Sequence, residues 1–420
     1  MKIGSIVAEY NPFHNGHRYQ IEKYKKEKGI SHVVVAMSGN FVQRGAPAVF
    51  DKFSRAEMAI SGGADLVIEI PAYFATQTAE IYARGAVMSI EALKCADSIC
   101  FGAEEEDTEK LKEIAEVLVF RKDEYEKELS TQLERKLPFP TARQEAVSKL
   151  LKGDCTDIMS KSNNILAIEY IKEILRIDSD IEPFSILRKG VEHNSRERSG
   201  KFRSATSIRE SICSIDSTDN HLAEIEDYVP EKSLEVIKRN IEKGFYPMNS
   251  QKFFDEICYS VLRDEENLDR YFEVNEGIEN SIRKKTTQSY DFNELVEELT
   301  SARYTSAKIR RSLFNILFGI EKGDMNCIKE IKSLPYVRVL AFNKRGTEIL
   351  KEIKNKSDVL IIKSPAKVKK SDEYRNSEVF KKMFDFDIRT SNIYYQKYYS
   401  GNRKVLKKGE PDFITLGYML

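Results

Sequence analysis

Two histidines near the N-terminus have the spacing and the setting of a phosphate site. In the stretch IVAEYNPFHNGHRY, His14, Gly16 and His17 follow an apolar run and open an amphipathic one, which predicts a strand-to-helix turn. The first turn of a helix carries unpaired N–H groups that attract phosphates, and a glycine lets a phosphate approach the backbone. Two imidazoles one turn apart could donate hydrogen bonds while charge builds on a leaving pyrophosphate. A chance pair of surface histidines is the alternative.

A second polar loop, SGNFVQRGAPAVF, follows the next apolar run, at the carboxyl end of an expected strand. Ligands of doubly wound sheets bind at such ends. We expect Asn40 and Arg44 to line a pocket for an adenylate or its acyl group, and a solvated loop is the alternative. In CFGAEEED, Gly102 ends another expected strand, where the missing side chain would let an adenine or ribose lie against the backbone.

The segment FRSATSIRESI brings hydroxyl groups and an arginine to the start of a helix. Ser204, Thr206 and Ser207 come just before Arg209, so hydroxyls, backbone N–H groups and a guanidinium would converge on one anion. Such a group suits the β- and γ-phosphates of a nucleotide. Alone, the segment could be an ordinary helix cap with a surface arginine. Together with the histidine motif it predicts the second half of one ATP site.

The elements that must hold these residues alternate between strands and helices. Runs rich in Val and Ile predict strands at Ile3–Ala8, His32–Met37, Ala64–Ile70 and Ser98–Phe101. Apolar residues three or four apart predict helices at His17–Lys28, Asp51–Ser61 and Thr76–Leu93. This order predicts an α/β fold with a Rossmann-like, doubly wound parallel sheet. A further strand is expected at Glu182–Leu187, after a largely helical stretch.

Shifts in composition divide the rest of the chain. Pro230 and Pro247 mark a boundary, beyond which we expect helices at Lys252–Leu262, Ile278–Lys285, Phe292–Leu299 and Ala307–Phe318. After Pro335, short β-prone runs alternate with basic loops. We therefore expect three parts: a nucleotide-binding catalytic domain over 1–222, a helical domain over 223–334 and a small basic α+β region over 335–420.

The net charge of zero hides an asymmetry along the chain. Residues 301–420 hold 26 Lys and Arg against 13 Asp and Glu, whereas residues 1–300 hold 41 against 54. A polyanion would be attracted to the C-terminal part, as expected when a nucleic-acid-binding region is joined to a catalytic domain. Ordinary variation of charge between domains is the alternative.

Composition also excludes several classes of protein. With 420 residues, 41% hydrophobic and 32% charged, the chain is not a disordered polyampholyte. No apolar run approaches the roughly 18 residues that a membrane helix needs, and the N-terminus lacks a signal peptide, so we expect a cytoplasmic protein without a membrane partner. The six cysteines are scattered without a C-x-x-C pair, which favours buried free thiols, and no metal site is predicted.

Taken together, these motifs resemble the tRNA(Met) cytidine acetate ligases, which carry a HIGH-type nucleotidylyltransferase-like domain. The resemblance runs through EYNPFHNGHRY, SGNFVQRGAPA, ADLVIEIP, ATQTAE, FGAE, SNNILAIEY, SATSIR, EGIENSIRKK and RYTSAKIRR, nearly the whole chain. It implies an enzyme that condenses free acetate with ATP to acetyl-adenylate and pyrophosphate and then acetylates N4 of the wobble cytidine of elongator tRNA(Met). Free acetate, in place of acetyl-CoA, would supply the acetyl group. Mg²⁺ would accompany the ATP.

The resemblance also implies site residues. It assigns catalysis to His14, His17 and Arg209. It assigns ATP binding to Val7, Ala8, Glu9, Tyr10, Asn11, Pro12, Phe13, His14, Asn15, Gly16, His17, Arg18, Tyr19, Gln20, Gly102, Asn163 and Arg188. Asn164 is the alternative to its neighbour Asn163. The chain departs from the family pattern at Ala46, Ala103 and Lys308, where Glu, Ser and Arg are expected.

Basic residues in the C-terminal half are candidates for holding the tRNA backbone. The candidates are Arg283, Lys284, Lys285, Arg303, Lys308, Arg310 and Arg311, with further basic runs at Lys363–Lys370 and Arg403–Lys408 and stacking faces at Tyr394, Tyr395, Tyr398 and Tyr399. The alternative enzyme is a small-molecule nucleotidylyltransferase, which needs no basic C-terminal third. A non-catalytic RNA-binding protein with a nucleotide fold is the alternative outside enzymes. The oligomeric state is not predicted.

Overall fold

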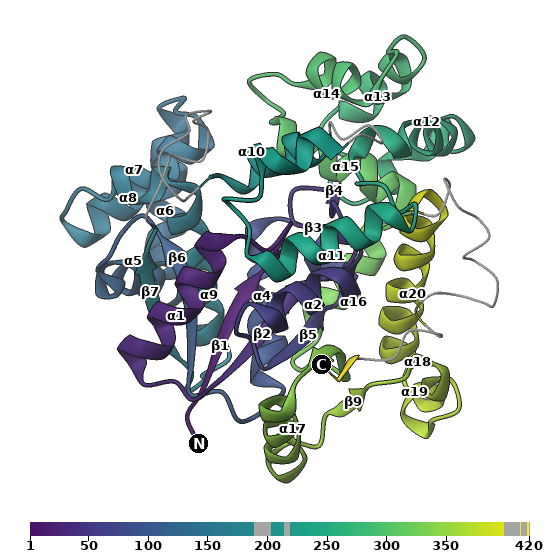
Figure 1. Ribbon diagram of the computed structural model, residues 1–420. Coiled ribbons are helices and arrows are strands. Elements are labelled where there is room, and N and C mark those ends of the chain that lie inside the picture. The colour runs from purple at the N-terminus through teal and green to yellow at the C-terminus, as the bar shows by residue number, and fades with distance from the viewer. Residues whose placement is uncertain (189–202, 214–218, 399–411, 413–417, 420) are drawn as a thin grey trace.

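Five parallel strands form the centre of the sheet in the computed structural model (Figure 1). The structure describes residues 1–188, 203–213, 219–398, 412 and 418–419. The parallel strands are β1 (Ile3–Ala8), β2 (His32–Ser38), β5 (Leu66–Ile70), β6 (Ser98–Ala103) and β7 (Glu182–Leu187). They lie in the order β5-β2-β1-β6-β7. The chain adds β2 and β5 on one side of β1 and then β6 and β7 on the other, so the strand order reverses between β1 and β6. Ligands of such sheets bind at this reversal, outside the carboxyl ends of the strands.

The strands lie close to where the apolar runs predict them. All seven residues of β2 are buried, as expected for a strand covered on both faces. The predicted start of β5 at Ala64 was wrong by two residues. Asp65 ends the preceding turn instead, because its carboxylate accepts a hydrogen bond from the backbone N–H of Val33 at 2.9 Å. The predicted Rossmann-like, doubly wound sheet is confirmed.

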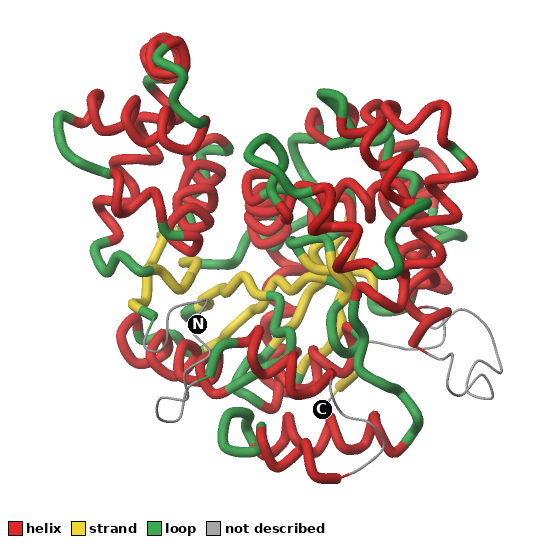
Figure 2. Tube along the Cα trace, turned by 90° about the horizontal axis from the view of Figure 1, so that it is seen from above, coloured by secondary structure: helices red, strands yellow, loops and turns green. Residues whose placement is uncertain are grey.

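Helices cover both faces of the sheet (Figure 2). The crossovers from β1 to β2 and from β2 to β5 run in one direction and carry α1 (Asn15–Lys28) and α2 (Lys52–Ser61). The return from β5 to β6 runs in the opposite direction, so right-handed connections place its helix on the other face. That second face carries α3 (Ala72–Ala75), α4 (Ala79–Glu91) and α9 (Ser162–Arg176).

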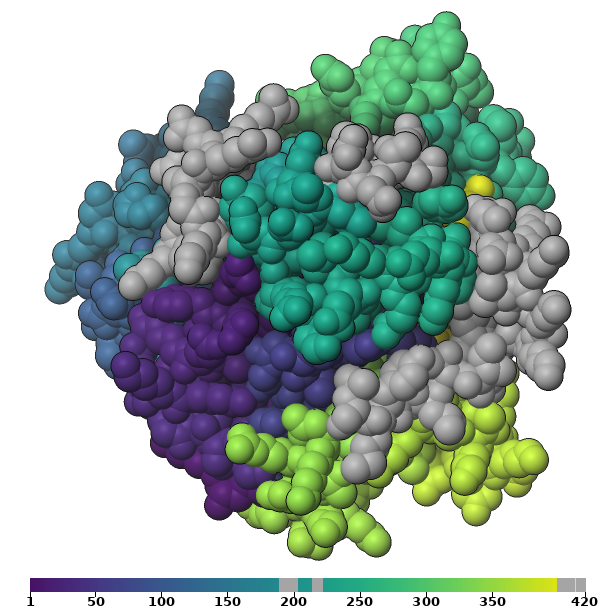
Figure 3. Space-filling view, viewed as in Figure 1, coloured from purple at the N-terminus to yellow at the C-terminus, as the bar shows by residue number. Residues whose placement is uncertain are grey.

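Two groups of helices flank the sheet, at the upper left and the upper right of Figure 1. The first group is α5 (Thr108–Phe120), α6 (Lys122–Glu134), α7 (Phe139–Leu151) and α8 (Thr156–Ser160). The second is α12 (Phe254–Arg263), α13 (Ile278–Thr286), α14 (Phe292–Leu299) and α15 (Ser306–Phe318). Helix α16 (Lys322–Glu330) follows and is labelled lower in Figure 1, beside α2. Between the two groups lie α10 (Ala205–Cys213) and α11 (Glu231–Glu242), drawn in teal at the centre of Figure 3.

The C-terminal region extends the N-terminal sheet rather than building its own. Strand β8 (Tyr336–Phe342) pairs antiparallel with β5, and β9 (Leu360–Ile362) and β10 (Tyr418–Met419) pair parallel with β8. The helices here are α17 (Lys344–Lys356), α18 (Pro365–Val368), α19 (Asp372–Asn376) and α20 (Glu378–Tyr398). The described strands after Pro335 therefore belong to the same sheet as the N-terminal strands.

A buried charge cluster joins these regions. The ammonium of Lys52 on α2 lies 2.9 Å from Glu69 of β5 and 3.1 Å from Asp412. Arg338 of β8 lies 2.9 Å from the same Asp412 carboxylate. All four side chains are buried, so each charge depends on its partners for stabilisation.

Arg55 on α2 holds together the loops that follow β1 and β2. Its guanidinium donates to the carbonyl oxygens of Glu9 and Ser38, at 2.5 and 3.1 Å, and also to the carbonyl of Gly39. The loop after β2 turns back on itself as a short hairpin of β3 (Phe41–Val42) and β4 (Ala46–Pro47). The two predicted polar loops are thus fixed relative to each other.

Two further observations bear on the sequence-based expectations. Among the described residues, no helix combines the length and the apolar character needed to cross a bilayer. All six cysteines are free, and Cys95, Cys100 and Cys155 are buried as expected. Cys258 is half-buried, and the expectation was wrong for Cys213 and Cys327, which are exposed on helices outside the sheet.

Candidate functional site

Both motif histidines lie at the N-terminus of α1. His14 is the N-cap residue, and its Nδ1 accepts a hydrogen bond from the backbone N–H of Gly16 at 3.1 Å. Nδ1 of His17 accepts from the backbone N–H of His14 at 3.2 Å. The two rings stack with their centroids 3.7 Å apart. The motif therefore builds a capping box from two imidazoles, which fixes the position of both rings.

These contacts define the protonation of the two rings. Since Nδ1 of each ring accepts a hydrogen bond, the proton of each neutral imidazole resides on Nε2. Burial lowers the pKa of His14 to about 3, and the charges of Arg188 and Arg209 add to the effect. Burial, His14 and Arg188 hold the pKa of His17 well below its ordinary value. Both rings are therefore neutral near pH 7, and each has one Nε2–H donor.

Arg188 lies directly after β7, beside the end of β6. Its Nη1 donates to Oδ1 of Asn163 at 2.7 Å, and its backbone N–H donates to the carbonyl of Ala103 at 3.0 Å. A Cβ atom on Gly102 would lie 3.1 Å from Cγ of Arg188. The glycine thus makes room for the arginine side chain, a role that differs from the expected contact with adenine or ribose. That contact stays a prediction.

Arg209 joins the two halves of the predicted ATP site. It extends from α10, where its Nη1 donates to the carbonyl of Asn11 at 3.0 Å and its Nη2 donates to Oγ1 of Thr206 at 2.9 Å. The hydroxyl of Ser204 accepts from the backbone N–H of Ser207 at 3.2 Å and caps this helix. The segment after Arg203 therefore lies against the histidine loop, although the two are far apart in the sequence.

Three arginines and the two histidines converge at the carboxyl ends of the strands. Arg188 and Arg209 are close enough to His14 to lower its pKa. The pKa values of Arg188 and Arg209 are themselves lowered, first by desolvation and also by the nearby charge of Arg44. This cluster, called the histidine–arginine cluster below, offers only hydrogen-bond donors and positive charge. Such a site attracts a polyphosphate.

The rest of the stretch from Val7 to Gln20 includes residues that support the fold. Tyr10 and Phe13 are buried, with ring centroids 4.8 Å apart. Oδ1 of Asn11 accepts from the backbone N–H of Val49 at 2.7 Å and ties the histidine loop to the second loop. Arg18 is exposed and forms an ion pair on the surface of α1. Contacts of these side chains with ATP stay predictions.

The two residues expected in the acyl pocket lie in different surroundings. Asn40 is buried, its Oδ1 accepts from the backbone N–H of Lys52 at 2.8 Å and its Nδ2 donates to the hydroxyl of Ser391 at 3.4 Å. Its amide thus joins the second loop to α2 and α20. Arg44 is exposed and is the third arginine of the histidine–arginine cluster. Contact of either residue with an acyl group stays a prediction.

The structure separates Asn163 from Asn164. Oδ1 of Asn164 accepts from the backbone N–H groups of Glu104 and Glu105 at 2.8 and 2.9 Å, and this side chain is buried. Asn163 instead faces Arg188. The geometry therefore favours Asn163 as the residue beside the site. Sequence reasoning missed the part of Glu104, although the residue belongs to the FGAE motif.

The seven basic residues expected to bind tRNA lie on α13, α15 and the segment between α14 and α15. Arg311 is buried and forms two hydrogen bonds with Glu273, at 2.6 and 2.8 Å. Lys285 pairs with Glu298 at 2.8 Å, whereas Lys284 is exposed. The other partners are Glu265 for Arg283, Glu276 for Arg303 and Lys308, and the ring of Phe292 for Arg310.

Three of the tyrosines expected to stack on RNA bases belong to the protein interior. Tyr394, Tyr395 and Tyr398 are buried along α20. The expectation is wrong for these three residues. Several other elements pack against α20 and cover more than one face of this helix. Tyr399 and the run Arg403–Lys408 lie outside the described residues.

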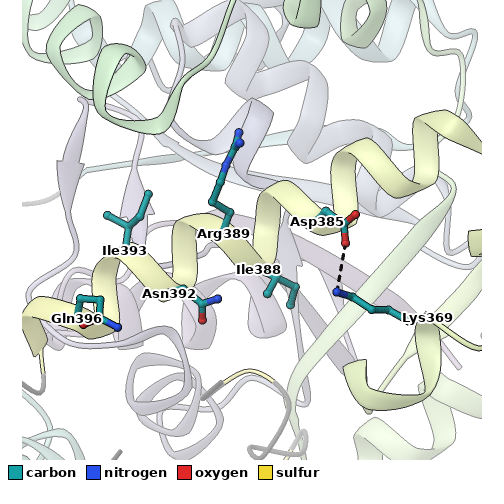
Figure 4. Close-up of a pocket in the computed structure, with 7 residues that line it drawn as sticks. All are labelled: Lys369, Asp385, Ile388, Arg389, Asn392, Ile393 and Gln396. Carbon is teal, nitrogen blue, oxygen red and sulfur yellow. Dashed lines mark ion pairs between the residues drawn. The ribbon is translucent and has the colours of Figure 1, made fainter. Parts of the chain in front are cut away.

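Two grooves lie away from these residues. One, of about 370 Å³, runs along α20, where Lys369 and Asp385 form an ion pair at 3.8 Å and Arg389 and Gln396 line the wall (Figure 4). The other lies between α17 and β9. Neither contains a residue of the histidine–arginine cluster. Within the described part of the chain, no group of three or more His, Cys, Asp or Glu side chains is arranged to hold a metal ion.

Comparison with known proteins identifies the family. A family model described as HIGH Nucleotidyl Transferase matches residues 1–408. A protein of Thermoanaerobacter sp. (strain X514), named tRNA(Met) cytidine acetate ligase, is 40% identical over 399 residues, which cover 95% of this chain and 96% of the relative. The chain belongs to the tRNA(Met) cytidine acetate ligase family. The resemblance drawn from the motifs is thereby confirmed.

Other members of the tRNA(Met) cytidine acetate ligase family agree. The relative from Acetivibrio thermocellus is 36% identical over 405 residues, or 95% of each chain. The crystal structure of Thermotoga maritima TmcAL bound with α-thio ATP superposes with a TM-score of 0.90 at 30% identity, over 100% of both chains. This ligase family therefore shares the whole fold with the present chain, and one solved member binds an ATP analogue.

Proposed function

We propose that this chain is an ATP-dependent ligase that acetylates N4 of the wobble cytidine of elongator tRNA(Met), as the names of its relatives indicate. The observation that carries the proposal is the convergence of two neutral imidazoles and three guanidinium groups at the switch point of the sheet. A cluster of this kind is built for a polyphosphate, and the family supplies the reaction.

In this proposal ATP lies across the N-terminus of α1. The Nε2–H groups of His14 and His17 donate to the α-phosphate and to the bridging oxygen of the leaving pyrophosphate. Arg188 and Arg209 neutralise the phosphate charge, which otherwise repels an anionic nucleophile. The adenosine lies toward Gly102 and Asn163, at the ends of β6 and α9. The second loop, with Arg44, then faces the acyl end.

The first half-reaction joins acetate to AMP. An acetate oxygen forms a bond to the α-phosphorus, the bond from that phosphorus to the bridging oxygen breaks, and pyrophosphate leaves. Acetate is a weak nucleophile, so the site must hold it in line with the leaving group. Because each neutral histidine carries an Nε2–H group, both can stabilise the growing negative charge by hydrogen bonds with no change in their own protonation.

The second half-reaction transfers the acetyl group to the tRNA. The N4 atom of cytidine attacks the acetyl carbonyl, the bond from that carbon to the AMP oxygen breaks, and AMP leaves as the amine loses a proton. The wobble base must leave its stack to reach the site, as single-stranded bases do when proteins read them. The exposed basic residues of the C-terminal half, such as Lys284, would hold the tRNA backbone, and the reaction would take place in the cytoplasm.

Mg²⁺ would enter with ATP as part of the substrate. The side chains of the histidine–arginine cluster are hydrogen-bond donors, which suit phosphate oxygens and not a cation. Phosphate oxygens and water are then the ligands that remain for Mg²⁺, which it accepts readily. The metal would contribute neutralisation of the phosphate charge.

Release of pyrophosphate tests this proposal. The purified protein is incubated with ATP and Mg²⁺, with and without acetate and elongator tRNA(Met), and compared with His14→Ala. Acetate-dependent release that the variant loses, with N4-acetylcytidine found in the tRNA, is the expected result. Release that is independent of acetate but requires a phosphate-bearing metabolite would instead favour a small-molecule nucleotidylyltransferase.

A further inference from the structure

Glu104 forms hydrogen bonds with Asn163 and Asn164, the two residues beside Arg188, through both its side chain and its backbone. Its Oε2 accepts from the backbone N–H of Asn164 at 3.0 Å, and its Oε1 accepts from Nδ2 of Asn163. Its own backbone N–H donates back to Asn164 at 2.8 Å. The loop after β6 is thus locked to the first turn of α9. Both carboxylate oxygens of Glu104 are occupied within the protein.

These contacts determine which way the amide of Asn163 faces. A carboxylate only accepts hydrogen bonds and a guanidinium only donates them. Asn163 lies between the two, so its Nδ2 must face Glu104 and its Oδ1 must face Arg188, at 2.7 Å from Nη1. If the amide were reversed, its oxygen would face the carboxylate of Glu104 and its NH₂ would face the guanidinium of Arg188. Acceptor would then meet acceptor, and donor would meet donor. Glu104 therefore orients Arg188 through Asn163.

The charges around Arg188 also connect it to Glu104. Desolvation lowers the pKa of Arg188, and the carboxylate of Glu104 opposes this effect and stabilises the positive charge. The stem of Arg188 occupies the space beside Gly102 that a side chain would fill, since a Cβ there would lie 3.1 Å from Cγ. The hydrogen bond to Asn163 thus orients the guanidinium in the absence of a ligand.

We propose that Glu104 is a positioning residue for ATP, which acts by holding Asn163 and through it Arg188. The inference rests on the proposed function only in that the histidine–arginine cluster binds ATP. It assigns to Glu104 no contact with acetate, tRNA or the reacting atoms. Loss of the hydrogen bonds between Glu104 and Asn163 should weaken ATP binding while the fold is retained.

Glu104→Gln is a sharp test because a glutamine has one acceptor and one donor where the glutamate has two acceptors. If its oxygen accepts from the backbone of Asn164, its NH₂ faces Nδ2 of Asn163 and forces that amide to turn. Oδ1 then leaves Arg188, and the loss of a charge-assisted hydrogen bond should raise the Kd for ATP by about 10-fold or more. Glu105→Gln is the matched control and should leave the Kd for ATP within about twofold. The carboxylate of Glu105 accepts from the backbone N–H of Asp107 and pairs with Lys110, away from Asn163.

A compensating pair makes the test specific. Asn163→Asp alone places two carboxylates in contact, so it should also weaken ATP binding. In the double variant, Glu104→Gln with Asn163→Asp, the glutamine NH₂ donates to the new carboxylate, whose second oxygen still accepts from Arg188. The number of charges is unchanged. The double variant should bind ATP within about threefold of the wild type, although each single variant binds about 10-fold or more weakly.

Binding is measured by calorimetry with ATP in the absence of acetate and tRNA, and the melting temperature is recorded with and without ATP. Recovery of the Kd in the double variant supports the inference. Additive losses in the double variant, or an unchanged Kd in Glu104→Gln, would overturn it. If either single variant fails to fold, the double variant must regain both folding and ATP affinity. Since the assay needs no acetyl transfer, a wild type that binds ATP without ligating acetate would refute the proposed function alone.

Discussion

Replacement of Gly102 by alanine tests how closely the site is packed around Arg188. The new methyl carbon would lie 3.1 Å from Cγ and 3.4 Å from Cδ of the arginine, whereas carbon atoms pack at about 3.5–4.0 Å. The side chain must therefore shift by roughly half an ångström. Such a shift stretches the 2.7 Å hydrogen bond to Asn163 and misplaces the guanidinium relative to the phosphates.

A weakened charge-assisted hydrogen bond should cost about 1–2 kcal/mol. Since about 1.4 kcal/mol is a factor of ten, the KM for ATP in Gly102→Ala should rise by roughly 5- to 30-fold. Gly102 lies in the extended backbone of β6, so the melting temperature should stay the same or rise slightly. Pyrophosphate release at varied ATP concentration measures the effect.

Gly153→Ala provides the matched control, because nothing lies within 4 Å of the Cβ it would gain. Its KM for ATP should equal that of the wild type. A KM in Gly102→Ala that is also unchanged would refute the argument that this glycine makes room for a fixed Arg188. A loss of folding in Gly102→Ala alone would show that the contact serves the core and not the site.

Three further predictions concern His14, the buried charge of Lys52, and the contrast between buried Arg311 and exposed Lys284. The pKa of His14 is about 3 in the folded protein but about 6.5 when unfolded, so stability is lost as the pH falls below about 6.5. Chemical denaturation should show that this slope is shallower in His14→Gln, by up to about 1.4 kcal/mol per pH unit. Lys52→Met should lower the free energy of unfolding by roughly 3–5 kcal/mol, because it leaves buried carboxylates uncompensated, and a fall below 1 kcal/mol would contradict the buried cluster. Arg311→Ala should lower the melting temperature without changing the Kd for tRNA, whereas Lys284→Ala should weaken tRNA binding with an unchanged melting temperature. The reverse pattern in filter binding and thermal melts would refute the assignment of these two residues.

Local patterns predicted the strands and the first half of the site well. The apolar runs that form β1 and β2 are buried on both faces, so burial and sequence carry the same signal. The histidine motif is also local, because a helix cap involves residues within one turn. Its rings could therefore be placed at the start of α1 before the fold was known.

Contacts between distant segments were harder to predict. Glu104, Asn163 and Arg188 come from three segments, and only the assembled sheet brings their side chains together. Strand β8 was expected, but its antiparallel partner β5 lies about 270 residues earlier in the chain, as the paired residues Leu66 and Phe342 illustrate. Tyr394 was offered as a stacking face because its type suits RNA, whereas its hydroxyl donates to the carbonyl of Ala48 in the interior.

Transfer of isotopically labelled acetate tests the central claim most directly. Elongator tRNA(Met) is incubated with the protein, ATP, Mg²⁺ and ¹³C-acetate, and the nucleosides are analysed by mass spectrometry. A parallel reaction replaces acetate and ATP with labelled acetyl-CoA. The account predicts label in N4-acetylcytidine from acetate in the presence of ATP, and its loss in His17→Ala. Labelling from acetyl-CoA without ATP, or ATP turnover that never labels the cytidine, would contradict it.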